Sequence, residues 1–201
     1  MTDSVNVACL VPGFEQPVEQ SQRTFRAVLA AMASPGTAGE VCGPASVGPL
    51  HSATLAVALT LLDRDTPVWL DAAADGAEVR DNLRFHCGCP LTQVPEAASF
   101  AIISNARSML PLERFEVGDD LYPDRAATLI VQLESLSGGA ELVLSGPGIE
   151  NRRVLRAAGL PEDFAAQWEL NHSLYPCGVD LILTAGASVA ALPRSTRLEV
   201  V

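Results

Sequence analysis

Strand-like segments crowd into the second half of the chain, and this distribution limits the folds that the chain can adopt. They are apolar runs bounded by turn residues, at residues 128–133, 141–144, 179–184, 189–192 and 197–201. Helix-like patterns lie mostly in the first half. The sequence therefore predicts an α/β fold in which helices pack against a sheet that is mixed or rich in antiparallel strands. It argues against a plain doubly wound parallel sheet.

Loops of small residues follow two of these runs. Ser135-Leu136-Ser137-Gly138-Gly139 connects residues 128–133 to residues 141–144, and its glycines permit the positive φ angles of a tight hairpin. We therefore expect these two runs to pair antiparallel. The backbone N–H groups of this loop and of Ser145-Gly146-Pro147-Gly148 could also cradle a phosphate. Neither loop has the GxGxxG pattern, so both are interpreted as turns.

Three helices are expected in the first half of the chain. Ser21 can cap the first helix, which ends before Pro35. Its core face is expected to consist of Phe25, Val28, Leu29 and Met32. Residues 52–62 are apolar all round and predict a buried helix. Asp75 and Glu78 resemble a capping box at the start of the third helix.

The remaining segments complete one expected domain over residues 1–201. A fourth helix should begin at Pro161. Short strands are predicted at residues 67–70 and 98–104. Residues 105–125 have the least regular pattern, with a short helix expected only near residues 109–115. Neither a repeat nor a linker divides the sequence, and its length is ordinary for one domain.

The chain contains no lysine, and all thirteen of its basic residues are arginine. A Schiff base with pyridoxal phosphate or a carbonyl substrate needs a primary amine on a side chain, so covalently held pyridoxal phosphate is excluded. A P-loop needs a lysine on the phosphates, which excludes an ordinary Walker nucleotide site. We therefore expect no cofactor. The guanidinium forks are instead suited to holding carboxylates or phosphates.

The charge balance and the apolar content indicate which partners the chain has. Its formal net charge is −11, which repels the phosphates of nucleic acids and anionic membrane surfaces. Hydrophobic residues make up 48% and charged residues 18%, so we expect an exposed apolar patch and a protein partner. Residues 1–10 lack a cationic export segment, and residues 53–62 are too short to span a bilayer. Together with an odd number of cysteines, five, these features favour a cytoplasmic protein with reduced thiols.

Side chains that bind metals or act as nucleophiles are few. His86-Cys87-Gly88-Cys89 places an imidazole and two thiols within four residues, but no fourth ligand has a spacing that points to it. Buried thiols at a helix end are therefore favoured over a metal site. The sequence has no GxSxG motif, and none of its cysteines lies in a recognisable catalytic signature. His172 is interpreted as a structural residue at a helix end, so no catalytic residue is assigned.

Five residues remain as candidate contacts for an anion or for a partner. Arg84 and Arg194 can each hold two oxygens with one guanidinium fork. The complete set is Arg26, Arg84, His86, Asp180 and Arg194. A surface charge or a charge on a helix end is the alternative interpretation of the arginines.

Short strings of residues occur in a fixed order between Phe25 and Val201. They are Phe25-Arg26, Ala31-Met32, Pro35-Gly36, Asp65-Thr66-Pro67-Val68-Trp69-Leu70, Leu83-Arg84-Phe85-His86, Pro90-Leu91, Ala127-Thr128-Leu129-Ile130, Ser135-Leu136-Ser137-Gly138-Gly139, Gly146, Gly148-Ile149, Gly178-Val179-Asp180-Leu181-Ile182-Leu183-Thr184 and Pro193-Arg194. In this order they resemble the PhnH family of phosphonate-metabolism proteins. None is specific alone, but their common order makes the resemblance strong. The residues before Gln20 and residues 105–125 match nothing recognisable in the family.

The resemblance implies a subunit of the carbon–phosphorus lyase core complex that works with PhnG, PhnI and PhnJ partners. That machinery takes ATP and an alkylphosphonate and displaces adenine to form α-D-ribose 1-methylphosphonate 5-triphosphate. Radical cleavage of the C–P bond follows in another subunit, and this chain lacks a CxxxCxxC cluster motif for that step. The family also implies a homodimer and a three-layer α/β/α fold with a mixed sheet, similar to the pyridoxal-phosphate-dependent transferases but without that cofactor.

Our leading hypothesis is a subunit that supports phosphonate-nucleotide synthesis only inside an assembly. One alternative is an independent metal-assisted hydrolase that uses His86, Cys87 and Cys89 with a distant His172 or Asp180. The other is a binding module without chemistry. In that case a phosphonate or a nucleotide phosphate would be held by Arg26, Arg84 or Arg194.

Overall fold

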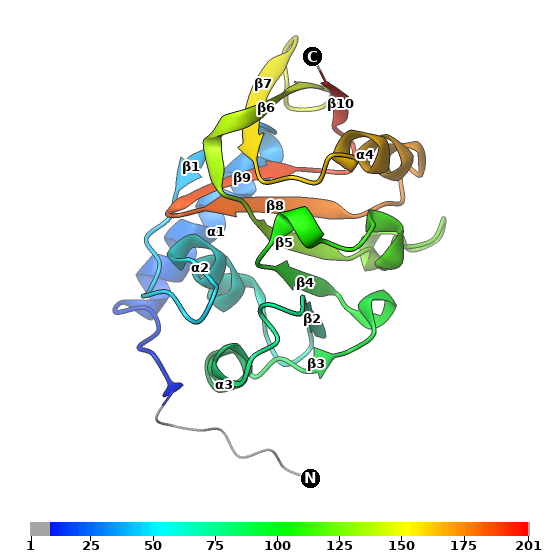
Figure 1. The fold of residues 1–201 in the computed structure, drawn as a ribbon. Coiled ribbons are helices and arrows are strands. Elements are labelled where there is room, and N and C mark those ends of the chain that lie inside the picture. The colour runs from blue at the N-terminus through cyan, green and yellow to red at the C-terminus, as the bar shows by residue number, and fades with distance from the viewer. Residues whose placement is uncertain (1–8, 201) are drawn as a thin grey trace.

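A seven-stranded mixed sheet forms the centre of the molecule, in the order β1-β9-β8-β5-β4-β2-β3 (Figure 1). The computed structural model describes residues 9–200. The strands are β1 (Gly39–Glu40), β2 (Val68–Leu70), β3 (Leu91–Thr92), β4 (Phe100–Ile103), β5 (Thr128–Gln132), β8 (Asp180–Ala185) and β9 (Ser188–Leu192). Strands β3, β2, β4, β5 and β8 run parallel, whereas β9 is antiparallel to β8 and β1 is antiparallel to β9. The predicted mixed α/β architecture is therefore confirmed.

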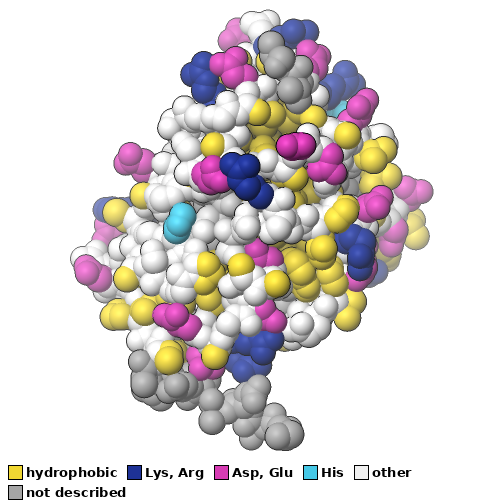
Figure 2. Space-filling view, viewed as in Figure 1, with side chains coloured by type: hydrophobic (Ala, Val, Ile, Leu, Met, Phe, Trp, Pro, Cys, Tyr) yellow, Lys and Arg dark blue, Asp and Glu magenta, His cyan; other side chains and the backbone are white. Residues whose placement is uncertain are grey.

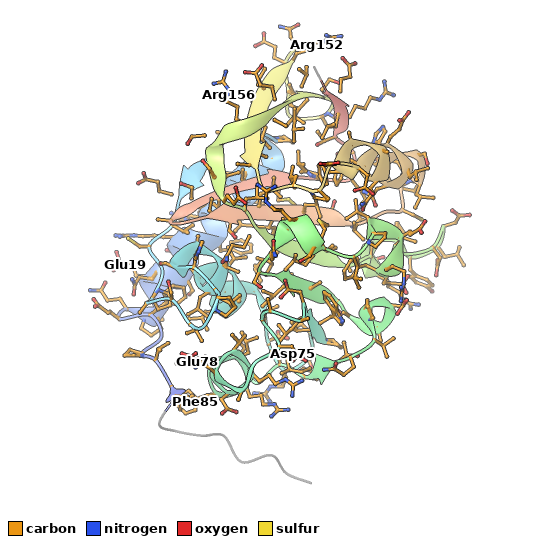
Figure 3. The ribbon with its side chains drawn as sticks, in the orientation of Figure 1. Glu19, Asp75, Glu78, Phe85, Arg152 and Arg156 are labelled. Carbon is orange, nitrogen blue, oxygen red and sulfur yellow. The ribbon has the colours of Figure 1, made fainter. Side chains whose placement is uncertain are left out.

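A second sheet of three antiparallel strands, in the order β10-β6-β7, stacks on the first. Its strands are β6 (Ser135–Ser145), β7 (Arg153–Ala158) and β10 (Arg197–Val200). Strand β7 was not predicted, because its arginines and alanines do not give an alternating apolar run. Figure 3 shows Arg152 and Arg156 at the outer end of this sheet, where Arg156 Nη2 lies 2.5 Å from Glu141 Oε1 on β6.

The prediction that residues 128–133 pair with residues 141–144 is wrong. Strand β5 is inserted between β4 and β8 with parallel pairing on both sides, and β6 passes into the second sheet. The glycines form an irregularity inside β6, where the register to β7 shifts between Ser135 and Ala140. Gly139 has a φ angle of 89°, and a Cβ atom there would lie 2.4 Å from the carbonyl oxygen of Ala157. Glycine is thus required by a bulge rather than by a hairpin turn.

The four helices are α1 (Pro17–Ala33), α2 (Ser52–Leu61), α3 (Ala77–His86) and α4 (Phe164–Ser173). Helix α2 is buried as predicted. Helix α1 begins at Pro17 rather than after Ser21, and its predicted core face is correct for Val28 and Met32 but wrong for Phe25 and Leu29. Phe25 and Leu29 are 49% and 56% exposed, whereas the buried residues are Thr24, Val28 and Ala31. These smaller residues let α1 pack against α2 and β9.

The start of α3 also differs from the prediction. Gly76 occupies the N-cap position, and no side chain among the described residues makes a capping hydrogen bond there. Asp75, labelled with Glu78 in Figure 3, instead pairs with Arg80 through two contacts of 2.5 and 2.7 Å. The hydrogen bond from Arg80 lowers the pKa of the Asp75 carboxyl. Within residues 105–125 the structure has 3₁₀ turns at Ala106–Ser108, Leu112–Arg114 and Pro123–Arg125.

Both faces of the central sheet are covered, which gives the molecule three layers (Figure 1). Ile102, Ile130 and Ile182 face the layer of α1, α2 and α3. Their neighbours Ile103 and Val131 face the opposite layer, which contains α4 and the three-stranded sheet. This alternation follows the period of two along a strand. None of the helices within residues 9–200 is long and apolar enough to cross a lipid bilayer.

The bulge in β6 yields a test of the packing between β6 and β7. Gly139→Ala should lower the free energy of unfolding by about 2 kcal/mol or more, because the new Cβ meets the Ala157 carbonyl in a left-handed backbone conformation. The melting temperature should fall by about 2–4 °C per kcal/mol. Gly138→Ala is the matched control, since nothing lies within 4 Å of its added Cβ. Equal melting temperatures for the two variants, measured by circular dichroism, would disprove the account of the bulge.

Candidate functional site

The candidate site lies at the carboxyl ends of the parallel strands. Strand β2 leads through α3 to β3 on one side, whereas β4 leads to β5 on the other side. Open α/β sheets bind ligands at such a point, where the chain leaves neighbouring strands in opposite directions. The residues that follow β2 and β4 here are polar. They are Asp71, Ser104 and Asn105.

The side-chain carboxylate of Asp71 occupies the crevice between β2 and β4. Its side chain is buried, and its Oδ1 atom accepts a hydrogen bond of 2.8 Å from the backbone N–H of Ala74. The Oδ2 atom accepts the backbone N–H groups of Ser104 and Asn105 at 2.9 and 3.1 Å. The hydroxyl of Ser104 adds a further contact of 2.9 Å. These donors satisfy the buried negative charge and tie the two strand ends together.

Gln132, at the end of β5, connects the crevice to the start of α2. Its Oε1 atom accepts the backbone N–H of His51 at 2.7 Å and the hydroxyl of Thr54 at 2.8 Å. Its Nε2 atom donates to the carbonyl oxygens of Pro49 and Ser104 at 2.9 and 3.2 Å. All the hydrogen-bonding capacity of this buried amide is therefore used, which fixes the position of α2 relative to the sheet.

A small hollow of about 210 Å³ opens beside Gln132. Its walls include His51, Ser104, Asn105 and Glu134. Arg107 Nε donates to Glu134 Oε1 at 2.7 Å, and Arg107 Nη2 donates to Oε2 at 3.1 Å. This forked contact lowers the pKa of Glu134 and raises the pKa of Arg107. The hollow offers hydroxyl, amide and imidazole groups, and an anion that entered it could compete with Glu134 for the guanidinium.

Asp180 and Arg194 are the two predicted contact residues that the structure brings together. Arg194 Nη2 lies 2.5 Å from Asp180 Oδ2, and the backbone N–H of Arg194 donates to Oδ1 at 2.7 Å. The side chains are only 16% and 15% exposed. Arg194 Nη1 also donates to the carbonyl oxygen of Pro123 at 2.6 Å. The fork of Arg194 thus holds Asp180, at the amino end of β8 and on the opposite edge of the sheet from the hollow.

The other predicted contact residues lie on separate elements. His86 Nε2 lies 2.9 Å from the carbonyl oxygen of Val11, so this ring connects the end of α3 to the segment before α1. Arg84 is half-buried on α3, and Arg26 is exposed on α1. An anion-binding or partner-binding role of these residues stays a prediction.

Cys87 and Cys89 lie together at the end of α3. A hydrogen bond between the two thiols lowers the pKa of Cys89 and raises the pKa of Cys87, and burial adds to the rise at Cys87. The physical cause is that one thiolate accepts the remaining S–H and then disfavours a second negative charge. Among residues 9–200, no group of three or more His, Cys, Asp or Glu side chains is placed to hold a metal ion.

Sequence reasoning did not single out Asp71, Ser104, Arg107 or Gln132. A signal was present, because Asp71, Ser104 and Gln132 are polar residues at the carboxyl ends of apolar runs. Side chains in these positions meet at one edge of a parallel sheet. The pattern was not usable while residues 128–133 were expected to form an antiparallel hairpin.

The fold and the crevice define a three-layer α/β protein with a mixed sheet and a polar carboxyl edge. The family model described as "Bacterial phosphonate metabolism protein (PhnH)" matches residues 12–199, and the chain belongs to this family. It is 40% identical over 187 residues to the alpha-D-ribose 1-methylphosphonate 5-triphosphate synthase subunit PhnH of Rhizobium meliloti (strain 1021), covering 92% of this chain and 94% of that protein. It is 31% identical over 182 residues to the putative C-P lyase subunit protein HtxG of Stutzerimonas stutzeri, covering 90% and 86%. The resemblance found in the sequence is confirmed.

The Asp180–Arg194 geometry predicts strong coupling between the two residues. Arg194→Ala should lower the free energy of unfolding by about 3 kcal/mol, because it leaves a largely buried carboxylate without its cation. The double variant, Arg194→Ala with Asp180→Ala, should lose clearly less free energy of unfolding than the two single variants lose together. Urea denaturation measures all of these values. The exposed Arg107–Glu134 pair is the control, and its two alanine substitutions should be nearly additive. Additive effects at Asp180 and Arg194 as well would contradict a structural ion pair.

Proposed function

We propose that this chain is a subunit of a carbon–phosphorus lyase complex in organophosphonate catabolism. It would support the formation of α-D-ribose 1-methylphosphonate 5-triphosphate from ATP and an alkylphosphonate. The observation that carries the proposal is the match to the R. meliloti synthase subunit, which extends over 94% of that protein. A second relative whose name also describes a C-P lyase subunit supports it.

Within this proposal the chain is an accessory subunit rather than a self-sufficient catalyst. The absence of lysine from the sequence supports this, since it excludes covalent catalysis through an amine and leaves covalent pyridoxal phosphate without an attachment point. The buried polar groups at the carboxyl edge, Asp71 and Gln132, are engaged in internal hydrogen bonds. A reactive centre supplied by another subunit is consistent with both observations.

The proposal includes partners of the PhnG, PhnI and PhnJ types and a homodimer of the isolated chain. It also includes a location in the cytoplasm, for which the odd number of cysteines is the support. A kinship of the fold with the pyridoxal-phosphate-dependent transferases is proposed on the sequence resemblance alone.

The proposal is tested by following adenine release from ATP and methylphosphonate by liquid chromatography. The chain alone should release no adenine, because it would lack the catalytic centre. The complex assembled with PhnG-, PhnI- and PhnJ-type subunits should release it, and omission of this chain should reduce the rate. Adenine release by the chain alone, or an unchanged rate in its absence, would refute the proposed role.

A second candidate function is the binding of a phosphonate or a nucleotide phosphate, and the hollow that is lined by Glu134, the ion-pair partner of Arg107, favours it. The exposed guanidinium can exchange Glu134 for an anionic ligand. Calorimetric titration with methylphosphonate and with ATP should then give heat that Arg107→Ala abolishes. Arg23→Ala on α1 removes another exposed, paired arginine and should change nothing. The same heat from wild type and Arg107→Ala would rule out the hollow as the binding site.

A further inference from the structure

An apolar groove of about 490 Å³ lies between α4 and the segment of residues 111–117. In Figure 2, hydrophobic side chains gather below the position of α4, with acidic and some basic side chains at their border. The groove borders the hydrophobic core, to which its wall residue Leu112 belongs. Its chemistry therefore differs from that of the polar hollow beside Gln132.

Helix α4 carries apolar residues on two opposite faces. Phe164 and Trp168 are buried on the inner face. Leu170 on the outer face and Leu174, directly after the helix, are 65% and 45% exposed. A helix that is apolar on both sides is normally covered on both sides. The outer face is therefore the kind of surface that a protein partner covers.

The opposite wall of the groove is held firmly in place. It is formed by the 3₁₀ turn at Leu112–Arg114 and by Val117. The backbone N–H of Leu112 donates to Gln167 Oε1 on α4 at 3.1 Å. The backbone N–H of Gly178 donates to the carbonyl oxygen of Val117 at 2.8 Å. A groove with two fixed walls is preorganised, which reduces the ordering cost of binding.

The exposed apolar surface continues beyond the groove along two loops. Leu121 is 82% exposed in one loop, and Tyr175 is 61% exposed in the other. Arg194 Nη1 donates to the carbonyl oxygen of Pro123 at 2.6 Å and approaches that of Pro176 at 3.5 Å. The partly buried Asp180–Arg194 pair thus holds both loops in place.

The charges around the groove indicate which kind of partner fits. Among the residues that line it, Glu113 and Asp163 are acidic and none is arginine or histidine. Asp119 and Asp120 are exposed on the adjacent loop. A second copy of the chain, with a net charge of −11, would place the same acidic groups against each other in a two-fold interface. Charge complementarity therefore favours a different, basic partner.

We propose that this groove binds an apolar segment of another subunit of the complex, flanked by lysine or arginine residues that face Glu113 and Asp163. The proposal rests on the proposed function, because the partner is a subunit of the same assembly. The apolar residues of the segment cover Leu170 and Leu174. The basic flanks make the binding dependent on ionic strength.

The test uses the complex obtained by co-expression with the PhnG-, PhnI- and PhnJ-type subunits, purified through a tag on one of them. Leu170→Glu should weaken retention of this chain about tenfold or more, because it places a charge in the apolar groove. The charge reversal Glu113→Arg with Asp163→Arg should weaken retention while the leucines stay intact. Wild-type retention should decrease as sodium chloride is raised. Leu29→Glu on α1, at a similarly exposed leucine, is the matched control and should be retained.

The outcomes separate this inference from the function beneath it. Failure of the wild-type chain to co-purify would overturn the proposed function. If wild type, Leu170→Glu and the charge-reversal variant are all retained equally, only the proposal that the groove binds a partner subunit is overturned. Light scattering of the isolated chain tests the other occupant, since a dimer that Leu170→Glu converts to a monomer would assign the groove to a second copy. If Leu170→Glu lowers the melting temperature, the charge-reversal variant decides, because Glu113 and Asp163 are exposed.

Discussion

The burial of both faces of the central strands is the constraint on which the rest of the structure depends. Ile102, Ile130 and Ile182 need a covering layer on one face, and Ile103 and Val131 need one on the other. The helices of the first half supply one layer, and α4 with the second sheet supplies the other. The polar side chains of the central strands are therefore confined to the strand ends. The crevice at the carboxyl edge and the Asp180–Arg194 pair at the amino edge follow from this arrangement.

Local features of the fold could be predicted from sequence, whereas strand pairing could not. The apolar runs locate β5, β8 and β9, and the continuous apolar stretch locates α2, because these elements are buried for most of their length. A buried run looks the same whether its neighbour is parallel or antiparallel. The glycines near residue 139 were consequently interpreted as a hairpin turn, although they form a bulge inside β6. The core face of α1 was only partly correct: Val28 is buried as expected, but Phe25 and Leu29 were preferred over the smaller Thr24 and Ala31, which pack where α2 approaches.

The candidate site was less predictable than the fold because its residues meet only in three dimensions. Sequence patterns predicted both Asp180 and Arg194 as contact residues. They did not predict that the guanidinium of Arg194 holds the carboxylate of Asp180. Asp71 and Gln132 stand as single polar residues at the ends of apolar runs, and their importance appears only once β2, β4 and β5 are known to be parallel neighbours. The family, by contrast, was recognisable from the order of short strings of residues, because that order does not depend on how the strands pair.

The occupied crevice changes what this fold offers to other molecules. In many α/β proteins the switch point is open and takes a ligand, whereas here Asp71 receives the N–H groups that would face one. Opening the crevice would leave a buried carboxylate without its donors, which is costly. Recognition is therefore left to surfaces beside or away from the crevice, such as the small hollow next to Gln132 and the apolar groove along α4. The larger of these two surfaces is apolar and acid-flanked, so contact with another protein chain is the interaction to which the molecule is best adapted.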